Sequence, residues 1–219
     1  MSDPARSATV RDSIGVGIAV GAYGFAFGAA SVSAGLSLLQ TCLLSLFAFT
    51  GGTQFAVVGV VAGGGGLAAA LPSGLLLGAR NTLYAMRLAP LLRVRGVRRW
   101  LAALGTIDES TAMAVAQREP RLSRVAFWWT FGGVYIFWNL TTLIGAVVGT
   151  VVDPATIGLD AVIPAAFLAL LAPRLRTGRI ERQMAVAAAV IAGVLIPFTP
   201  PGVPVLAACA ALLLATTVR

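Results

Sequence analysis

The sequence predicts an all-α fold, a polytopic bundle of transmembrane helices. Hydrophobic residues make up 58 % of the 219 residues and charged residues only 11 %, and the mean hydropathy is +0.90. A water-soluble domain could not bury so much apolar surface in one core. We therefore expect a single transmembrane domain over residues 1–219, with about six full spans and a polar, cytoplasmic segment at residues 1–12.

The charges and cysteines exclude several other classes of protein. All sixteen basic residues are arginines, the formal net charge is +8, and most arginines lie in clusters between apolar runs. Such clusters predict cytoplasmic loops, not a nucleic-acid surface. Cys42 and Cys209 both lie inside apolar runs, which predicts neither a disulfide framework nor a metal site. We expect no cofactor.

Residues 13–34 predict the first span, since an apolar run of about twenty residues can cross a bilayer. Four glycines recur there at helical spacing and share one face, namely Gly17, Gly21, Gly24 and Gly28. Small-residue faces of this kind let a neighbouring helix approach closely. Close helix packing is the favoured interpretation, and contact with a ligand is the alternative.

The next apolar run, residues 36–63, contains a polar interruption near Gly51. Two adjacent glycines among hydroxyl and amide side chains favour either a kinked span or two half-helices that meet at membrane depth. The positive end of such a half-helix suits a substrate carboxylate. The predicted substrate-binding residues are therefore Gly51, Gly52, Thr53 and Gln54.

Residues 72–90 predict a second full span that carries Arg80 and Asn81 near its middle. Arginine keeps its charge even when desolvated, so an arginine at membrane depth normally faces a bundle interior or a water-filled path. We predict that Arg80 binds substrate, with Asn81 as a polar lining residue. The alternative is that Arg80 extends to the lipid headgroups.

Residues 101–117 form a shorter, moderately apolar segment with Asp108 and Glu109 near its centre. Arginine clusters flank it at residues 93–99 and 118–124, and a segment with two basic flanks does not easily cross the membrane once. We predict a re-entrant or interfacial element. If residues 36–63 also return to their own side, all basic loops and both termini are cytoplasmic.

The remaining apolar runs predict four more spans, at residues 126–152, 157–173, 184–196 and 203–218. Asn139 lies in the middle of the first of them and is a further predicted polar lining residue. Asp160 lies near the start of the second, where it could either serve transport or stabilise a helix N-terminus.

Enzyme signatures are weak along the whole chain. The sequence has no histidine, which excludes Ser-His and Cys-His pairs and imidazole metal ligands. The glycine-rich stretches lack the context of a phosphate-binding loop. We expect no enzymatic activity.

Five segments together resemble a known family: GGTQFAVVG, GARNTLYAMRLAP, TIDESTAMA, WNLTTLIGAVVG and GLDAVIPAAFLALLAP. Their order is similar to that in AzlC-like large subunits of bacterial branched-chain amino-acid exporters. Members of that family commonly have an asparagine two residues before the arginine and often a histidine after it, where this chain has Gly78 and Asn81. The resemblance implies a multi-pass protein of the bacterial inner membrane that exports branched-chain amino acids, with methionine as a further candidate, together with a small AzlD-like membrane subunit.

Export of a zwitterion needs a donor for the carboxylate, an acceptor for the ammonium and an apolar pocket for the side chain. Arg80 and the backbone near Gly51 suit the carboxylate. The acids Asp108, Glu109 and Asp160 are the candidate acceptors for the ammonium and the candidates for proton coupling. In the competing interpretation Asp108 and Glu109 only pair with nearby arginines at the cytoplasmic surface. A non-transporting scaffold subunit and a transporter of another small solute remain as alternative functions.

Overall fold

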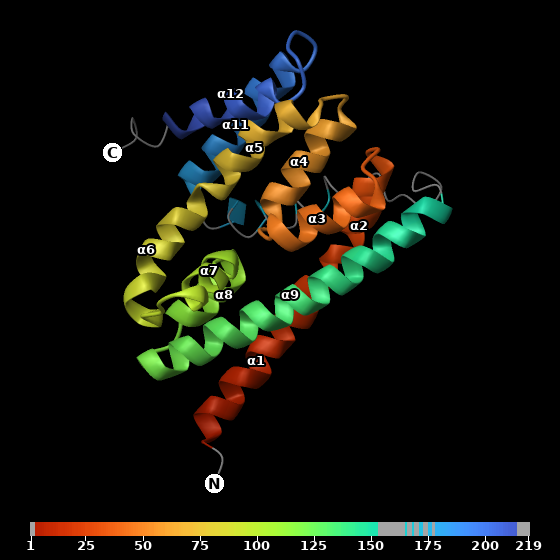
Figure 1. Ribbon diagram of the computed structural model, residues 1–219. Coiled ribbons are helices and arrows are strands. Elements are labelled where there is room, and N and C mark those ends of the chain that lie inside the picture. The colour runs from red at the N-terminus through yellow and green to blue at the C-terminus, as the bar shows by residue number, and fades with distance from the viewer. Residues whose placement is uncertain are drawn as a thin grey trace.

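The computed structural model in Figure 1 describes residues 3–152, 165, 168, 171–172, 175–176 and 178–213. All regular elements in these residues are helices, in agreement with the predicted class. They are α1 (Pro4–Gly21), α2 (Tyr23–Ser33), α3 (Leu38–Phe47), α4 (Gly52–Ala62), α5 (Leu67–Gly78), α6 (Arg80–Leu92), α7 (Val97–Leu104), α8 (Asp108–Val115), α9 (Pro120–Val151), α11 (Arg179–Leu195), α12 (Val203–Ala208) and the 3₁₀ helix η3 (Cys209–Leu213).

Two long helical stretches lie side by side through the molecule (Figure 1). One is α1 followed by α2, separated only by Ala22, and the other is α9. They run parallel, since Gly17 lies against Gly133 and Gly28 lies further along against Ala146. A Cβ atom at Gly17 would lie only 2.9 Å from the backbone of Gly133, so this approach requires glycine. The glycine face of the first span is thus confirmed as a helix-packing face.

The other broken elements enter the molecule from its two ends (Figure 1). α3 runs inward from the end of α2, and α4 runs back outward after the break at residues 48–51. The run at residues 36–63 therefore forms two half-length helices and not one kinked span. α7 and α8 form a second pair of this kind beside the end of α6, with a break at residues 105–107.

The start of the chain and the basic segments at residues 93–99 and 118–124 lie together at one end of the described structure. Arg121, in the first turn of α9, forms an ion pair with Asp3 at the start of α1, with an N···O distance of 3.3 Å. Arg124 donates a hydrogen bond of 2.9 Å to the carbonyl of Leu91, just before the arginines at 93–99. This gathering agrees with the arrangement in which residues 36–63 return to their own side.

The expected count of about six full spans is not confirmed. Within the described residues, only residues 4–33 and 120–151 form helices long and apolar enough to cross a membrane by length and composition. The predicted span at residues 72–90 is divided at Ala79 into α5 and α6, and α3 and α4 have only 10 and 11 residues. Helices of that length rise about 15 Å, half the hydrocarbon thickness. Most of the predicted span at residues 157–173 lies outside the described residues.

The predicted carboxy-terminal hairpin is present as α11, α12 and η3, with residues 214–219 outside the description. Its turn contacts the glycine-rich link between α4 and α5, because Pro201 lies against Gly65 and Gly202 lies against Ala69. The turn therefore lies at the end of α5 that is remote from α6, opposite the basic segments (Figure 1).

An aromatic core fills the space between the long helices and α4. Trp138 of α9 stacks on Phe27 of α2, with ring centroids 6.0 Å apart, and meets the edge of Phe55 of α4 at 6.2 Å. Phe49, in the break between α3 and α4, lies against Tyr135 at 4.9 Å. This core supports one wall of the cavity described next.

Candidate functional site

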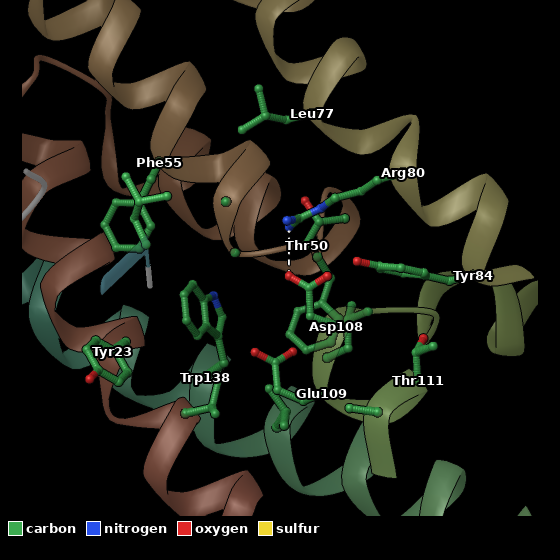
Figure 2. A pocket seen from close by; sticks show the side chains of 18 of the residues that line it. Tyr23, Thr50, Phe55, Leu77, Arg80, Tyr84, Asp108, Glu109, Thr111 and Trp138 are labelled. Carbon is green, nitrogen blue, oxygen red and sulfur yellow. Dashed lines mark ion pairs between the residues drawn. The ribbon is translucent and has the colours of Figure 1, made fainter. Parts of the chain in front are cut away.

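Three helix interruptions meet at one cavity of about 940 Å³ (Figure 2). The α3–α4 break contributes Thr50 and Gly51, the α5–α6 break contributes Arg80, and the α7–α8 break contributes Ile107 and the acids that follow it. Interrupted backbone at membrane depth persists only where protein or a water-filled cavity satisfies its polar groups. The cavity therefore provides one place in which the polar backbone groups of all three interruptions can be satisfied.

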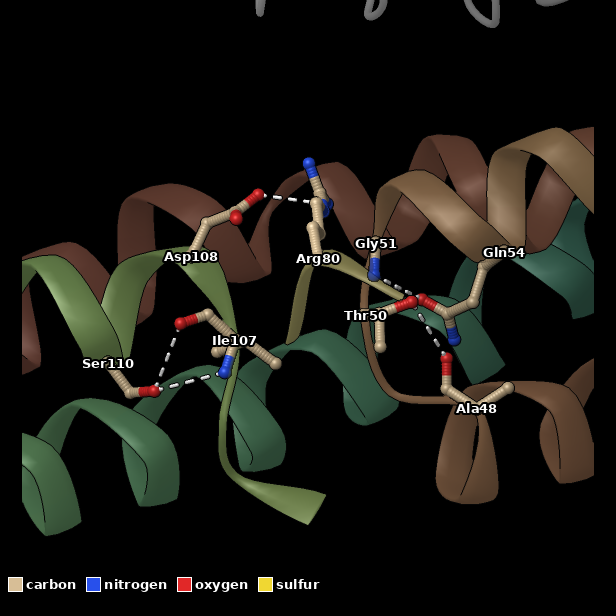
Figure 3. Close-up of polar contacts among 8 residues, drawn as sticks. All are labelled: Ala48, Thr50, Gly51, Gln54, Arg80, Ile107, Asp108 and Ser110. Carbon is tan, nitrogen blue, oxygen red and sulfur yellow. Dashed lines mark hydrogen bonds and ion pairs between the residues drawn. The ribbon is translucent and has the colours of Figure 1, made fainter. Parts of the chain in front are cut away.

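The α3–α4 break depends on Gly51 and Gln54. Gly51 has φ of +59°, a conformation that is strained for residues with a Cβ atom. The side-chain oxygen of Gln54 accepts a hydrogen bond of 3.0 Å from the Gly51 N–H, and its amide nitrogen donates one of 3.1 Å to the Leu44 carbonyl (Figure 3 shows the first). The fully buried Gln54 thus ties together the two helices on either side of the break.

The α7–α8 break is closed by Ser110. Its hydroxyl accepts a hydrogen bond of 3.2 Å from the Ile107 N–H and donates to the carbonyl of Gly105 (Figure 3 shows the contact with Ile107). The chain then turns directly into α8, so Asp108 and Glu109 occupy its first turn. Acids are favourable at that position because the helix N-terminus carries partial positive charge.

Arg80 and Asp108 form an ion pair across the cavity, with 2.9 Å between Nη2 and Oδ2 (Figures 2 and 3). Each is the first residue of its helix. Their side chains retain 37 % and 41 % exposure, which leaves the pair accessible from the cavity. Arg80 Nε and Asp108 Oδ1 are buried and have no hydrogen-bond partner among the described residues. A solute would therefore reach the pair through its exposed atoms.

The positive ends of two helices also lie at this cavity. α4 begins at Gly52 and α8 at Asp108, and both residues line the cavity. Unpaired N–H groups and the helix dipole make each of these ends favourable for an anion. Together with the Arg80 guanidinium, they suit a carboxylate near the break of α3 and α4.

Glu109 lies beside the ion pair and also lines the cavity (Figure 2). It belongs to α8, an eight-residue helix that is too short to span a membrane. Burial raises the pKa of Glu109 above its usual value of 4.5, and the neighbouring Asp108 raises it further. A backbone hydrogen bond and the Arg80 charge act in the opposite direction on this pKa. The net direction favours a carboxyl that binds a proton more readily than an ordinary glutamate.

The rest of the cavity wall is largely apolar and aromatic. Phe49, Phe55, Leu77, Val134 and Trp138 line it, supplied by α4, α5, α9 and the α3–α4 break. The combination of an apolar wall with a few convergent polar groups is typical of small-molecule sites, which occupy about 300–1,000 Å³.

The structure brings five of the predicted site residues together at the cavity, namely Gly51, Gly52, Arg80, Asp108 and Glu109. Thr53 is buried beside Gly78 of α5, and Gln54 bridges the break, so neither lines the cavity. Asn81 does not line it either. Asn139 accepts a hydrogen bond of 2.7 Å from Ser45 and donates one of 2.8 Å to the Tyr135 carbonyl, as a link between α3 and α9. Asp160 lies outside the described residues.

Six further polar residues line the cavity that were not predicted as site residues: Tyr23, Thr50, Tyr84, Arg87, Thr111 and Trp138. Arg80, Tyr84 and Arg87 are spaced four and three residues apart, which places them on one face of α6, and this spacing was readable in the sequence. Trp138 is only 4 % exposed, and its indole N–H finds no acceptor among the described residues. Figure 2 shows the indole beside Glu109 at the cavity wall.

The competing interpretation, in which Asp108 pairs with loop arginines at the surface, is not supported in the described residues, since Asp108 pairs with Arg80. The glycines at residues 145 and 149 of α9 also pack against α2: Gly145 lies against Phe25 and Gly149 against Ala29. They are therefore not available as a docking surface.

Comparison with known proteins places the site within a family. No curated protein and no solved structure matches the chain. A family model described as AzlC protein matches residues 15–152. The matched residues include all three helix interruptions and both members of the Arg80–Asp108 pair. Of the residues that line the cavity, only Leu168 and Leu171 lie outside the match. The chain therefore belongs to the AzlC family, which suggests a component of a branched-chain amino-acid exporter.

Proposed function

We propose that this chain is the solute-translocating subunit of an exporter of branched-chain amino acids, with methionine as a further candidate substrate. Family membership supports the solute class. The observation that carries the proposal is the accessible Arg80–Asp108 pair in a cavity with an otherwise mostly apolar wall.

The pair matches the two charges of an amino acid. When a zwitterion enters, its carboxylate binds the Arg80 guanidinium and its ammonium binds the Asp108 carboxylate, so each charge exchanges one partner for another of the same sign. A solute with only one of the two charges would leave the other member of the pair unpaired, which is costly in a partly buried site.

The cavity wall matches the aliphatic side chain. Phe55, Val134 and Trp138 present apolar surface within the same cavity as the ion pair. Burial of a leucine- or valine-sized side chain against such a wall contributes about 1.5–3 kcal/mol. None of these three residues carries a charge that would favour a polar side chain.

Glu109 is the proposed proton carrier, with proton movement driving export. It lies in the cavity beside the substrate charges, and burial raises its pKa. Protonation of Glu109 would remove a negative charge next to Asp108 and so weaken the hold of the site on an ammonium.

The family is generally associated with a small AzlD-like membrane subunit, and we propose such a subunit as the partner here. The proposed location is the bacterial inner membrane, with the basic end in the cytoplasm, as the positive-inside rule favours. A scaffold subunit without transport activity is the alternative. The cavity favours the transporting role, because a scaffold has no need of an accessible ion pair.

The test is export of radiolabelled leucine and valine from cells that contain this chain, its small partner, both or neither. The proposal expects fast efflux with both subunits and little with either one. Efflux that is equal with and without this chain would contradict it. The same purified chain in lipid vesicles should transport more slowly than the two-subunit preparation, and equal rates would remove the need for a partner.

A further inference from the structure

We propose that Arg87 is a second carboxylate-binding site, which receives the substrate at the basic end of the cavity before Arg80 binds it. This inference rests on the proposed function. Arg87 takes no part in the Arg80–Asp108 pair, and a solute that enters from the basic end would meet it before it meets Arg80.

Helix geometry places Arg87 on the same path as Arg80. Arg80, Tyr84 and Arg87 all line the cavity, and their spacing puts them on one face of α6. Seven residues of helix separate the two arginines by about 10 Å along the axis. Because Asp108 holds the Arg80 guanidinium at its own end of this stretch, we treat the two arginines as successive positions along the path.

The direction of α6 places Arg87 toward the basic end. α6 ends at Leu92, and the Leu91 carbonyl accepts the hydrogen bond from Arg124 that joins this end to α9. α8 begins at Asp108 and extends toward the same end (Figure 1). Arg87 therefore lies between the ion pair and the arginine-rich loops.

The electrostatics distinguish Arg87 from Arg80. Arg80 is neutralised by Asp108, whereas Arg87 forms no ion pair within the described residues. After its acidic first turn, α8 contributes only Thr111, Ala112 and Val115 to the cavity, none of which is charged. Arg87 is thus an uncompensated positive charge in this part of the cavity, and it attracts an anionic group that enters from the basic end.

The competing explanation is that Arg87 only helps to set the orientation of the protein in the membrane, as one more basic residue near the loops. Arg95 provides the matched control. It is an exposed arginine of the adjacent loop, it forms no ion pair among the described residues, and it does not line the cavity. A role in orientation would be shared by Arg95, whereas a role in binding would not.

The experiment measures leucine transport by the two-subunit complex in vesicles of both orientations. Arg87→Gln should raise KM for leucine at the basic-loop face about tenfold, the effect of losing one charge-assisted hydrogen bond. The maximal rate at that face and the KM at the opposite face should change less than twofold. The maximal rate at the opposite face should fall about tenfold, because release then passes the altered position and the ratio of maximal rate to KM must change equally at both faces. Arg95→Gln should leave both KM values unchanged.

Charge rescue makes the test independent of folding. Arg87→Cys, in a background with Cys42→Ser and Cys209→Ser, should regain low KM after reaction with an aminoethyl methanethiosulfonate and not with its sulfonatoethyl analogue. A wild-type KM for Arg87→Gln at the basic-loop face, an equal rise for Arg95→Gln, or rescue by both reagents would each overturn the inference. Absence of leucine transport by the wild-type complex would instead overturn the proposed function itself.

Discussion

Arg80 and Asp108 begin two different helices, and their side chains meet at 2.9 Å in a cavity bordered by a third helix interruption. The pair is exposed enough to be reached by a solute and lies against an apolar wall. A charge pair in such a place suits a zwitterion, whose two charges replace the two partners.

Arg80→Lys should impair transport without preventing membrane insertion. Lysine keeps the charge but lacks the planar group that can hold Asp108 and a carboxylate through several parallel hydrogen bonds. We expect kcat/KM for leucine to fall about tenfold to a hundredfold, with an unchanged amount of protein in the membrane fraction. Wild-type affinity in this variant would show that Arg80 does not bind the carboxylate.

Glu109→Gln should uncouple export from the pH gradient. The amide cannot carry a proton, so gradient-driven efflux of leucine should be lost while leucine exchange across the membrane continues. Asp108→Asn serves as the comparison, since it should weaken both processes by removing the ammonium partner. Unchanged gradient-driven efflux in Glu109→Gln would exclude Glu109 as the proton carrier.

The pKa of Glu109 can be checked through stability. Burial raises its pKa in the folded protein above 4.5, so the folded state holds the proton more tightly than the unfolded chain. The contribution of Glu109 to the free energy of unfolding should therefore fall as the pH rises from 4.5 through the higher folded-state pKa. Gln cannot titrate, so Glu109→Gln does not lose this stability. The Tm of the variant should therefore rise relative to the Tm of the wild type as the pH rises. A constant difference in Tm would contradict the raised pKa.

Gly51→Ala should destabilise the protein through the backbone. Gly51 has a φ of 59° and a ψ of −80°, and a residue with a Cβ atom in such a sparsely populated conformation costs about 1–3 kcal/mol. Gly59→Ala in the following helix is the matched control, because Gly59 has no positive φ and a Cβ atom there meets nothing within 4 Å. Thermal unfolding in detergent should show a lower Tm for Gly51→Ala and no loss for Gly59→Ala. Equal Tm values would mean that the break does not depend on Gly51.

Gly17→Ala should loosen the contact between α1 and α9. The added methyl group would lie 2.9 Å from the Gly133 backbone, and overpacking of this kind costs about 1–3 kcal/mol. Gly15→Ala is the control, since a Cβ atom there meets nothing within 4 Å. We expect a reduced Tm for Gly17→Ala alone, and the same Tm in both variants would contradict the packing.

The sequence predicts the helical class and the break at Gly51 because both depend on local composition. Apolar runs, paired glycines and adjacent polar side chains are properties of neighbouring residues. The number of full spans is less accessible, because the interruption at Ala79 lies between two good helical segments and carries no proline of its own. Ala79 itself keeps helical φ and ψ angles of −57° and −29°. The local change is in the hydrogen bonding, with the Thr82 N–H donating to the Ala79 carbonyl three residues back, and a hydropathy pattern does not register such a change.

The sequence also identifies Arg80, Asp108 and Glu109 as unusual, but it does not pair them. The partner of a charge is chosen by tertiary structure, and the sequence offered several arginines for Asp108 and an incoming carboxylate for Arg80. For Gln54 and Asn139, an amide that lines a path and an amide that joins two helices have the same local signature. Their hydrogen bonds to Gly51, Leu44, Ser45 and Tyr135 could be assigned only from the structure.

The most direct test of the Arg80–Asp108 account compares leucine with 4-methylpentanoate, which has the same side chain and carboxylate but no ammonium. Each compound is titrated as a competitor of radiolabelled leucine transport by the wild-type complex and by Asp108→Asn. In wild type, 4-methylpentanoate should compete at least tenfold more weakly than leucine, about 1.4 kcal/mol, because it leaves Asp108 unpaired. In Asp108→Asn the two compounds should compete equally. An undiminished preference for leucine in Asp108→Asn would show that Asp108 does not bind the ammonium group and would contradict the account.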